Sequence, residues 1–590
     1  MKSWIVTVLG AAMLTQPAFA QSALKVVYPP TDLETTSARI FLIGTAPANA
    51  VVTVNGQIVR DRSPSGHFSP SISLQVGSNT ITVKAQEQTL TLVVKRLSVA
   101  PPAPKGFAFA EGSLTPAVDI ARQPGEPICF GAIAPAKAQV TVRLGRQAVA
   151  LYPQPRAVTL PPNSAVLTAE NSPSPMLQGT AARAELYQGC TVLSGSGELG
   201  TPLFELRRGK TAIVRRGIGK IAILPPQILP VTEVTGDPGT ARTGPSTDYS
   251  RLTPLPKGTQ ALVTGREGEW LRLDYGGWIK QSETRPIVNG ALPRSIVRSV
   301  RVQTQADRTN VIFPLQVPVP VAVKQADGTF TLTLYNTTAQ TDTIAQTPGP
   351  VLSRLDWQQV TPGQVQYQLH LKNQQQWGYQ LRYEGTSLVL SLRHPPPFAS
   401  TAAPLAGTTI LLDPGHGSAN DKGSVGPTGY PEKDAVLVVS NLLRRALERQ
   451  GAKVVATREG DEDLYPNDRV KKIEQVVPTL AISLHYNALP DGGDAWNTKG
   501  VSTFWYHPQA QGLAVFLHDH LVQKMGRPSY GVYWNNLALT RPAIAPSILL
   551  ELGFMINPNE FEWITDPDAQ QQLAKTLAEG IALWVQKNRL

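Results

Sequence analysis

The pattern of apolar residues changes once along this chain, at about residue 407, and this change limits what the chain can fold into. Before that point, short runs alternate apolar and polar residues between turns, as in Val51-Val52-Thr53-Val54. Alternation with a period of two predicts strands that bury one face. After Gly407, apolar strand-like runs alternate with amphipathic helical stretches, which predicts an α/β domain with a parallel or mixed sheet. The fold class expected is therefore multidomain, with several small all-β domains followed by a C-terminal α/β domain.

Length and composition agree with several domains. The chain has 590 residues, more than one hydrophobic core organises, and its 51 Pro and 48 Gly indicate many turns and linkers. The net charge of +11 favours polyanionic partners such as cell-wall polymers or anionic lipid surfaces. Nucleic acid is not expected as a partner, because no recognition motif accompanies the charge.

The first twenty residues have the three parts of a secretory signal. Met1-Lys2-Ser3 carries charge, an apolar run extends from Trp4 to Thr15, and Ala18-Phe19-Ala20 supplies small residues. We predict a signal peptide over residues 1–20 and export to the periplasm or cell wall. An uncleaved membrane anchor is the alternative, but the run is short for a span of about 20 residues. No integral membrane segment is expected after cleavage.

The only two cysteines, Cys129 and Cys190, fall in one expected β domain. In an oxidising compartment they can form a disulfide. Two buried free thiols are the alternative, because sequence does not establish the required geometry.

Pro-rich breaks divide the first part of the chain into four β regions. We expect them over residues 21–98, 105–223, 228–290 and 294–394. The first resembles bacterial immunoglobulin-like modules, in which a Val-Asn-Gly hairpin, here Val54-Asn55-Gly56, precedes a strand such as Gly77 to Val83. Those modules are usually spacers or adhesive units. Nothing assigns the second region beyond its strand-like pieces.

The third region resembles a bacterial SH3-like barrel. Its segments include Gly244-Pro245-Ser246-Thr247, Leu255-Pro256-Lys257-Gly258, Trp270-Leu271-Arg272-Leu273 and Gly277-Trp278-Ile279. Such modules often hold enzymes on the wall, although Trp270 and Trp278 are equally well explained as core residues. The fourth region loosely resembles the AMIN-type domains that target cell-wall amidases, partly through its place just before residue 407.

The α/β domain, expected over residues 407–590, carries its chemistry at strand ends. His416 and His485 closely follow apolar strands, Glu551 ends another, and Glu432 lies in a Gly-rich connection before a helix. In open α/β sheets the carboxyl edge is where sites assemble. Two imidazoles and one carboxylate are a common ligand set for catalytic zinc, with a fourth position left for water. We therefore predict one Zn²⁺ held by His416, Glu432 and His485.

Hydrolysis also needs a group that moves protons. Glu551 follows Ile548-Leu549-Leu550, where partial desolvation raises the pKa of a carboxylate toward the working range. A surface glutamate at a strand end, or a partner for Arg541, is the alternative.

Four ordered motifs resemble those of zinc-dependent N-acetylmuramoyl-L-alanine amidases. They are Leu411-Leu412-Asp413-Pro414-Gly415-His416-Gly417, Gly429-Tyr430-Pro431-Glu432-Lys433-Asp434, Ser483-Leu484-His485-Tyr486-Asn487-Ala488 and Leu550-Glu551-Leu552-Gly553-Phe554. The resemblance implies that His416, Glu432 and His485 bind zinc and that Glu551 is the catalytic carboxylate. It also implies peptidoglycan as substrate, cut at the amide between the lactyl group of N-acetylmuramic acid and L-alanine of the stem peptide.

Other residues of the domain receive smaller roles. Asn487 is a candidate for binding substrate or orienting a ligand, whereas His507, His518 and His520 are not expected to bind metal. Thr457-Arg458, Asp463-Leu464 and Asp468-Arg469 resemble a family segment that is structural. Only Leu489 to Lys499 separates the second histidine motif from the next strand, where some relatives insert a blocking helix. The resemblance therefore implies an open site, with any restraint coming from the N-terminal domains.

The leading hypothesis is an exported peptidoglycan amidase acting in wall remodelling or daughter-cell separation, with a protein activator of the divisome as a further partner. The cellular role rests on the resemblance alone. A zinc peptidase that cuts within stem peptides is the enzymatic alternative, since the same chemistry hydrolyses either amide. A non-catalytic wall-binding or activator protein is disfavoured because all four chemical residues are present.

Overall fold

The computed structural model describes residues 23–98, 104–154, 158–168, 174–175, 184–288, 290, 292–397 and 400–589. The predicted signal peptide, residues 1–20, and residues 101–103 of the Pro-rich linker lie outside these ranges. Within them, no helix is both long and apolar enough to cross a membrane. The described chain is built of β structure up to residue 397 and of alternating strands and helices from residue 409, as predicted.

The first region is a sandwich in which the segment of β3 and β4 buries both of its faces. Its strands are β1 (Lys25–Tyr28), β2 (Leu33–Thr35), β3 (Arg39–Phe41), β4 (Ile43–Thr45), β5 (Val52–Val54), β6 (Gln57–Ile58), β7 (His67–Phe68), β8 (Ser71–Ser73), β9 (Gly77–Ala85) and β10 (Gln88–Arg96). Ile40 and Leu42 enter the core of the sandwich, whereas Phe41 and Ile43 point the other way and are also buried. Because neighbouring strand residues face opposite sides, something outside the sandwich must cover Phe41 and Ile43.

Residues 104–288 form the next β regions. Their elements are β11 (Ile120–Arg122), β12 (Pro127–Pro135), β13 (Gln139–Leu144), β14 (Gln147–Pro153), β15 (Val158–Thr159), η1 (Asn163–Thr168), β16 (Ser174–Pro175), β17 (Ala184–Val192), β18 (Gly197–Gly200), β19 (Leu203–Arg208), β20 (Thr211–Arg216), β21 (Ile221–Ile223), β22 (Val231–Val234), β23 (Gln260–Glu267), β24 (Trp270–Leu273), β25 (Trp278–Lys280), η2 (Gln281–Glu283) and β26 (Thr284–Ile287). One sheet, ordered β18-β21-β11-β23-β22-β26, joins strands from both sides of the expected boundary at residues 223–228.

Two sequence expectations fall in this part of the chain. Cys129 and Cys190 are directly opposite each other on β12 and β17, with their sulfur atoms at bonding distance, 2.11 Å. Trp270 and Trp278 are 6% and 8% exposed, as expected of core residues. The SH3-like character of residues 228–290 stays a prediction.

Residues 292–397 form a two-sheet β region. Its strands are β27 (Ser295–Thr304), β28 (Arg308–Phe313), β29 (Val321–Ala326), β30 (Thr329–Tyr335), β31 (Thr337–Gln346), β32 (Leu352–Thr361), β33 (Gln364–Leu371), β34 (Tyr379–Glu384) and β35 (Ser387–Arg393). The sheets are ordered β31-β27-β28-β35-β34 and β29-β30-β33-β32 around one apolar core.

The C-terminal domain has a six-stranded sheet ordered β37-β36-β38-β41-β39-β40. Its elements are β36 (Thr409–Pro414), α1 (Glu432–Arg449), β37 (Lys453–Ala456), α2 (Pro466–Val476), β38 (Leu480–Asn487), β39 (Val501–Trp505), α3 (Pro508–Met525), β40 (Ser529–Trp534), η3 (Ala538–Thr540), β41 (Ser547–Phe554), α4 (Pro558–Thr565) and α5 (Pro567–Asn588). Strands β37, β36, β38 and β41 are parallel to one another, so their carboxyl ends lie along one edge.

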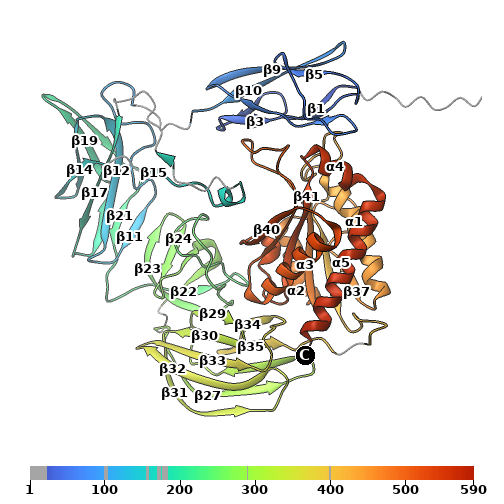
Figure 1. The fold of residues 1–590 in the computed structure, drawn as a ribbon. Coiled ribbons are helices and arrows are strands. Elements are labelled where there is room, and N and C mark those ends of the chain that lie inside the picture. Colours follow the sequence, from blue (N-terminus) through green and yellow to red (C-terminus); the bar gives the residue numbers. More distant parts are fainter. Residues whose placement is uncertain are drawn as a thin grey trace, which may run out of the picture.

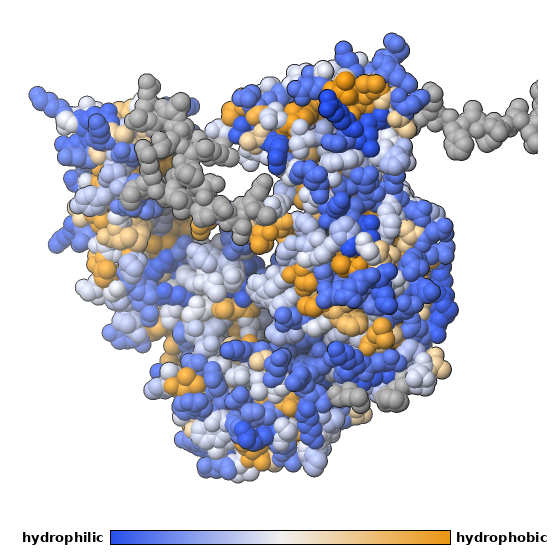
Figure 2. Space-filling view, viewed as in Figure 1, coloured by the Kyte–Doolittle hydropathy of each residue, from blue (hydrophilic) through white to orange (hydrophobic). Residues whose placement is uncertain are grey.

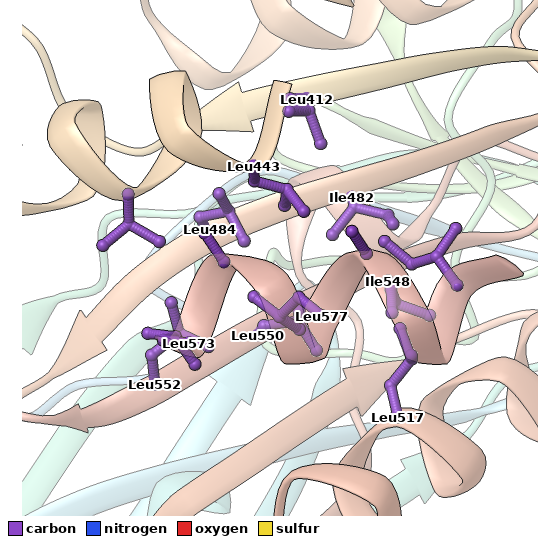
Figure 3. Close-up of a cluster of buried hydrophobic side chains, with 14 of the residues drawn as sticks. Leu412, Leu443, Ile482, Leu484, Leu517, Ile548, Leu550, Leu552, Leu573 and Leu577 are labelled. Carbon is purple, nitrogen blue, oxygen red and sulfur yellow. The ribbon is translucent and has the colours of Figure 1, made fainter. Parts of the chain in front are cut away.

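Alternate residues of these strands enter two layers. Leu412, Leu484 and Leu550 pack with α1, α3 and α5 on one face (Figure 3). Leu411 and Ala481 pack with α2 and η3 on the other face. Burial of both faces explains why the strands read as continuous apolar runs in the sequence.

The chain folds back so that its first and last domains touch. The sandwich lies over the end of the α/β domain that carries α4, the strands from β11 to β26 lie to the left of that domain, and the strands from β27 to β35 lie at its opposite end (Figure 1). Residues 409–588 thus form the central body, with β regions from distant parts of the sequence around it.

Candidate metal centre and active site

Three side chains converge at the carboxyl edge of the sheet. One ligand atom from each of His416, Glu432 and His485 lies within 4.8 Å of the other two. The Oε1 atom of Glu432 is 3.3 Å from His416 Nε2 and 3.0 Å from His485 Nδ1. In the part of the chain that the structure describes, this is the one group of three or more such residues close enough to share an ion.

The spacing of these atoms fits a zinc ion. Zinc–nitrogen and zinc–oxygen bonds of about 2.0–2.2 Å in a tetrahedral arrangement place neighbouring donor atoms about 3.3 Å apart. The two donor distances to Glu432 Oε1 are close to this value. The donor set therefore suits zinc in both chemistry and separation.

Glycines make room for the ligands. A side chain at position 415 would place its Cβ 2.2 Å from His485 Cε1, and one at position 423 would lie 2.5 Å from both Glu432 Oε2 and His416 Cδ2. These separations are below van der Waals contact, so the Gly-rich loop packs its backbone directly against the ligands. This is the local reason for the Gly-rich spacing around His416.

His416 is held in an unusual backbone conformation. Its φ of 58° lies in the left-handed region, which costs a non-glycine residue about 1 kcal/mol or more. Arg469 donates from Nη1 to the carbonyl of Pro414 at 2.9 Å and from Nη2 to the carbonyl of His416. Arg458 donates from Nη2 to the carbonyl of Gly415 at 2.9 Å. Two buried guanidinium groups therefore support the loop that presents the imidazole.

Asp421 orients the ring of His416. The Nδ1 atom of His416 donates to Asp421 Oδ1 at 2.5 Å, which leaves Nε2 facing Glu432. A carboxylate behind a histidine ligand fixes its tautomer and raises its basicity. Burial alone would lower the pKa of His416, but the hydrogen bonds and charges of Glu432 and Asp421 outweigh it and raise that pKa to about 9. The sequence reasoning missed Asp421, whose only signal is an acid five residues after the histidine.

Glu432 is kept ionised although it is buried. Ser424 donates to Glu432 Oε2 from its backbone nitrogen at 2.8 Å and from its hydroxyl at 3.0 Å, and the nitrogen of Tyr486 donates to Oε1 at 3.0 Å. Burial would raise the pKa of Glu432, but hydrogen bonds with His416 and His485 hold it well below its usual range. Glu432 is the first residue of helix α1, whereas the sequence placed it in the connection before a helix.

Glu551 lies beside the three ligands, inside a strand. The prediction placed it at the end of a strand, but β41 continues to Phe554, which pairs with Asn487 of β38. Glu551 is opposite His485 on β38 and opposite Ser502 on β39. Neither a surface strand end nor a partnership with Arg541 describes this environment.

The carboxylate of Glu551 has unused bonding capacity. Its Oε2 atom is buried and has no hydrogen-bond partner in the described residues. Burial raises the pKa of Glu551 well above its usual range, and the negative charge of Glu432 adds to the effect. The unpartnered Oε2 of Glu551 lies beside the metal-binding cluster, where a carboxyl group can take up or release a proton.

The remaining candidates lie apart from this cluster or are otherwise engaged. His507 Nε2 donates to the carbonyl of Arg541 at 2.7 Å, and burial lowers the pKa of His507 to about 4. His518 shares a hydrogen bond of 2.9 Å with the hydroxyl of Ser529. His520 stacks against Phe516. Asn487 accepts from the backbone nitrogen of Ala488 at 2.8 Å, so its side-chain oxygen closes a local turn.

Comparison with known proteins agrees with the motifs. Residues 410–583 match the model of the family described as N-acetylmuramoyl-L-alanine amidase. The expected resemblance of the C-terminal domain is therefore confirmed, and the mostly β region before an α/β amidase domain fits the expected fold class. The immunoglobulin-like, SH3-like and AMIN-like resemblances stay predictions.

A curated relative matches about a third of the chain. The probable cell wall amidase LytH of Staphylococcus aureus is 35% identical over 184 residues, which are 31% of this chain and 60% of that protein. The chain thus spans less than two thirds of the relatives it matches.

Solved structures of amidases also resemble part of the chain. The catalytic domain of CwlV, an N-acetylmuramoyl-L-alanine amidase from Bacillus (Paenibacillus) polymyxa var. colistinus, is 27% identical, with 30% of this chain and 97% of that chain covered and a TM-score of 0.28. An N-acetylmuramoyl-L-alanine amidase from Clostridium difficile 630 is 28% identical, with 30% and 96% covered and a TM-score of 0.29.

Proposed function

We propose that this chain, whose residues 410–583 match the amidase family, is a zinc-dependent peptidoglycan amidase. It hydrolyses the amide between the lactyl group of N-acetylmuramic acid and L-alanine of the stem peptide. The observation that carries the proposal is the convergence of His416, Glu432 and His485 beside the unpartnered Glu551. Two imidazoles, one carboxylate and a separate proton-transfer group are what metal-assisted amide hydrolysis requires.

His416, Glu432 and His485 would hold the zinc, with Asp421 orienting His416 and Ser424 keeping Glu432 ionised. Zinc bound there supplies two effects, polarisation of the scissile carbonyl and a lower pKa for the attacking water. Glu551 accepts a proton from that water on Oε2 and delivers it to the amide nitrogen of L-alanine, which leaves as an amine. The lactyl carbonyl carbon gains the hydroxyl of water, and the carboxylic acid so formed passes its proton to the released amine, which leaves a carboxylate and an ammonium group.

The cellular setting belongs to the same proposal. Cell wall amidases act outside the cytoplasm, which agrees with a signal peptide over residues 1–20 and with a Cys129–Cys190 disulfide. Periplasmic or wall-bound location, regulation by a protein activator, and wall binding through residues 228–290 or 294–394 are finer proposals that depend on the amidase reading.

Product analysis tests the reaction. The purified full-length chain with zinc is expected to release intact stem peptides that begin with L-alanine from purified peptidoglycan, and mass spectrometry identifies them. Shortened stems still attached to glycan would instead support a zinc peptidase. Glu551→Ala is expected to retain zinc and wall binding and to lose hydrolysis by about 10²- to 10⁴-fold. Undiminished hydrolysis by that variant would refute the role of Glu551, and a wild-type chain without zinc would refute the metal site.

A further inference from the structure

The N-terminal sandwich packs against the same end of the α/β domain that carries the metal centre. Phe41 and Ile43 of the sandwich, each 3% exposed, form an apolar cluster with Ala495, Phe554 and Ile556. Tyr28, Leu489 and Tyr530 pack around this cluster. Side chains buried this fully across a domain boundary indicate a stable contact, in contrast to the spacer role expected of an immunoglobulin-like module.

The sandwich also binds two loops that adjoin the metal-binding residues. Lys25 Nζ donates to the carbonyl of Thr428 at 2.7 Å, four residues before Glu432. Arg39 donates from Nε and Nη2 to the carbonyl of Gly492 at 3.0 and 2.7 Å, and Tyr28 donates to Asp491. Asp491 and Gly492 lie in the connection that follows β38, the strand of His485. The sandwich therefore holds one loop beside each of two ligands.

A third contact lies on the segment that follows β41. The backbone nitrogen of Ser65 donates to Glu562 Oε1 of α4 at 2.8 Å, and the ring of His67 packs edge-on against Phe561 with ring centres 5.4 Å apart. Phe554, in the apolar cluster, is the last residue of the strand that carries Glu551. All three strands that supply the site thus continue into segments that touch the sandwich.

The docked sandwich leaves the metal centre accessible. The side chains of His416 and His485 are 25% and 17% exposed with the sandwich in place. On the face drawn in Figure 2, the sandwich and the α/β domain meet along a seam of mainly hydrophilic residues. The sandwich therefore lies beside the site and does not plug it.

We infer that the N-terminal sandwich is a fixed wall of the substrate-binding edge, in which Phe41 and Ile43 are positioning residues that hold the loops around Thr428 and Gly492. This inference rests on the proposed function and deepens it. A peptidoglycan strand is a long polymer, so its approach to the metal centre passes the neighbouring surface. The wall then sets how the polymer is presented, and its loss raises KM for wall polymer more than it changes zinc binding.

A disulfide lock tests whether the sandwich stays in place during turnover. A Cβ built on Gly492 lies 4.0 Å from Ser37 Cβ, within the range of about 3.5–4.5 Å that disulfides require. The two native cysteines face each other elsewhere. In Ser37→Cys/Gly492→Cys we expect the cross-link to form in most molecules on oxidation. The oxidised protein should degrade purified peptidoglycan within twofold of its reduced form. A tenfold loss on oxidation would show that the sandwich must leave, and would overturn the fixed wall.

Disruption of the apolar cluster tests what happens when the sandwich is released from the α/β domain. Phe41→Asp is expected to lower kcat/KM for purified peptidoglycan at least tenfold, mainly through KM, with zinc content unchanged. Phe41→Leu should retain activity. Leu489→Asp disrupts the contact from the α/β domain and should act like Phe41→Asp even if the latter unfolds the sandwich. Val51→Asp and Ile58→Asp are matched controls, because these residues are 64% and 63% exposed on the same sandwich.

Rescue separates positioning from simple damage. When Phe41→Asp is combined with Ser37→Cys/Gly492→Cys, oxidation restores the contact and should recover most of the lost activity on the wall. Cross-link formation and zinc content are measured independently of hydrolysis. If Phe41→Asp and Leu489→Asp keep the wild-type KM and kcat, the inference that the sandwich is a wall of the substrate-binding edge is refuted, but the proposed function is not. A wild-type chain that releases no stem peptide would overturn the proposed function and, with it, this inference.

Discussion

Two clusters of buried charged residues lie near the end of β36. Asp413 belongs to the first cluster, and His416, three residues later, belongs to the second. The two clusters differ in how their charged groups are hydrogen-bonded. Asp413 accepts hydrogen bonds on both oxygens, from Thr457 at 2.5 Å, from Ser483 at 2.6 Å and from Arg469 at 2.7 Å. Beyond it, Glu432 and Glu551 are two buried acids close enough to affect each other, and Glu551 leaves one oxygen unpaired. In the first cluster both oxygens of Asp413 accept hydrogen bonds, whereas in the second cluster Oε2 of Glu551 accepts none from the described residues.

The difference separates residues that build the site from residues that react in it. A buried ion pair whose groups are all hydrogen-bonded gives a specific, rigid support. Two like charges and an unpaired oxygen cost folding free energy, and such costs are typical of functional sites. Mutations in the two clusters should therefore have different effects on stability, zinc binding and activity.

The largest effect is expected where the satisfied cluster is broken. Arg469→Met leaves Asp413 buried without its cation and should lower the free energy of unfolding by about 3–5 kcal/mol. Thermal or denaturant unfolding of the full-length chain measures it. Lys471→Met, on the same helix with a side chain 68% exposed, is the control and should stay within about 0.5 kcal/mol of wild type. Equal effects of the two changes would contradict the comparison.

Acid should weaken the same cluster. Burial alone would raise the pKa of Asp413, but Arg469, Ser483 and Thr457 together hold it below its usual value. A group with a lowered folded-state pKa stabilises the protein above its unfolded pKa, and this contribution is lost as pH falls through the folded pKa. We therefore expect the midpoint of thermal unfolding to fall when the pH is lowered below about 4. The drop should be smaller in Asp413→Asn, and an identical acid profile in both proteins would exclude Asp413 as a cause.

Loss of Asp421 should act on the metal alone. Asp421→Ala removes the carboxylate behind His416 and should weaken zinc binding by about 10- to 100-fold, with little change in unfolding of the metal-free protein. Titration with a competing chelator measures the affinity. Asp463→Ala is a control from the neighbouring loop, since Asp463 accepts only from Ser418 and Asn420 there. Undiminished affinity in Asp421→Ala would show that His416 needs no orienting partner.

The smallest effect on stability is expected at Glu551, where substitution should not lower the free energy of unfolding. Glu551→Gln removes an acid whose ionisation is opposed by burial and by the charge of Glu432, so the free energy of unfolding should stay constant or rise by about 1 kcal/mol. Calorimetry of the zinc-free and zinc-bound proteins measures this change. A clear loss of stability would mean that Glu551 is a structural residue like Asp413.

Much of the α/β domain could be predicted because its signals are local. Apolar runs marked β36, β38 and β41, and their shared carboxyl edge brought His416, His485 and Glu551 together. The continuation of β41 past Glu551 depends on pairing with β38, which lies far away in sequence. Asp421 was missed because one acid in a polar loop gives no periodic signal.

The domain contacts could not be predicted for the same physical reason. Phe41 and Ile43 alternate with Ile40 and Leu42 in an unbroken apolar run, which shows that both faces are buried but not by what. The surface that covers them comes from residues 489–556, and neither segment carries a sequence signal that predicts contact with the other. Likewise, the pairing of β11 with β23 joins strands from regions that a Pro-rich break separates.

The contact between Lys25 and Thr428 joins residues 403 positions apart. This separation determines the order in which parts of the protein fold. A chain synthesised from its N-terminus completes the sandwich long before the domain that covers Phe41 and Ile43 exists. Such distant contacts form late, and the uncovered apolar face is a site for misassembly until then. The proposed hydrolase would therefore acquire its complete substrate-binding edge only in the last step of its own folding.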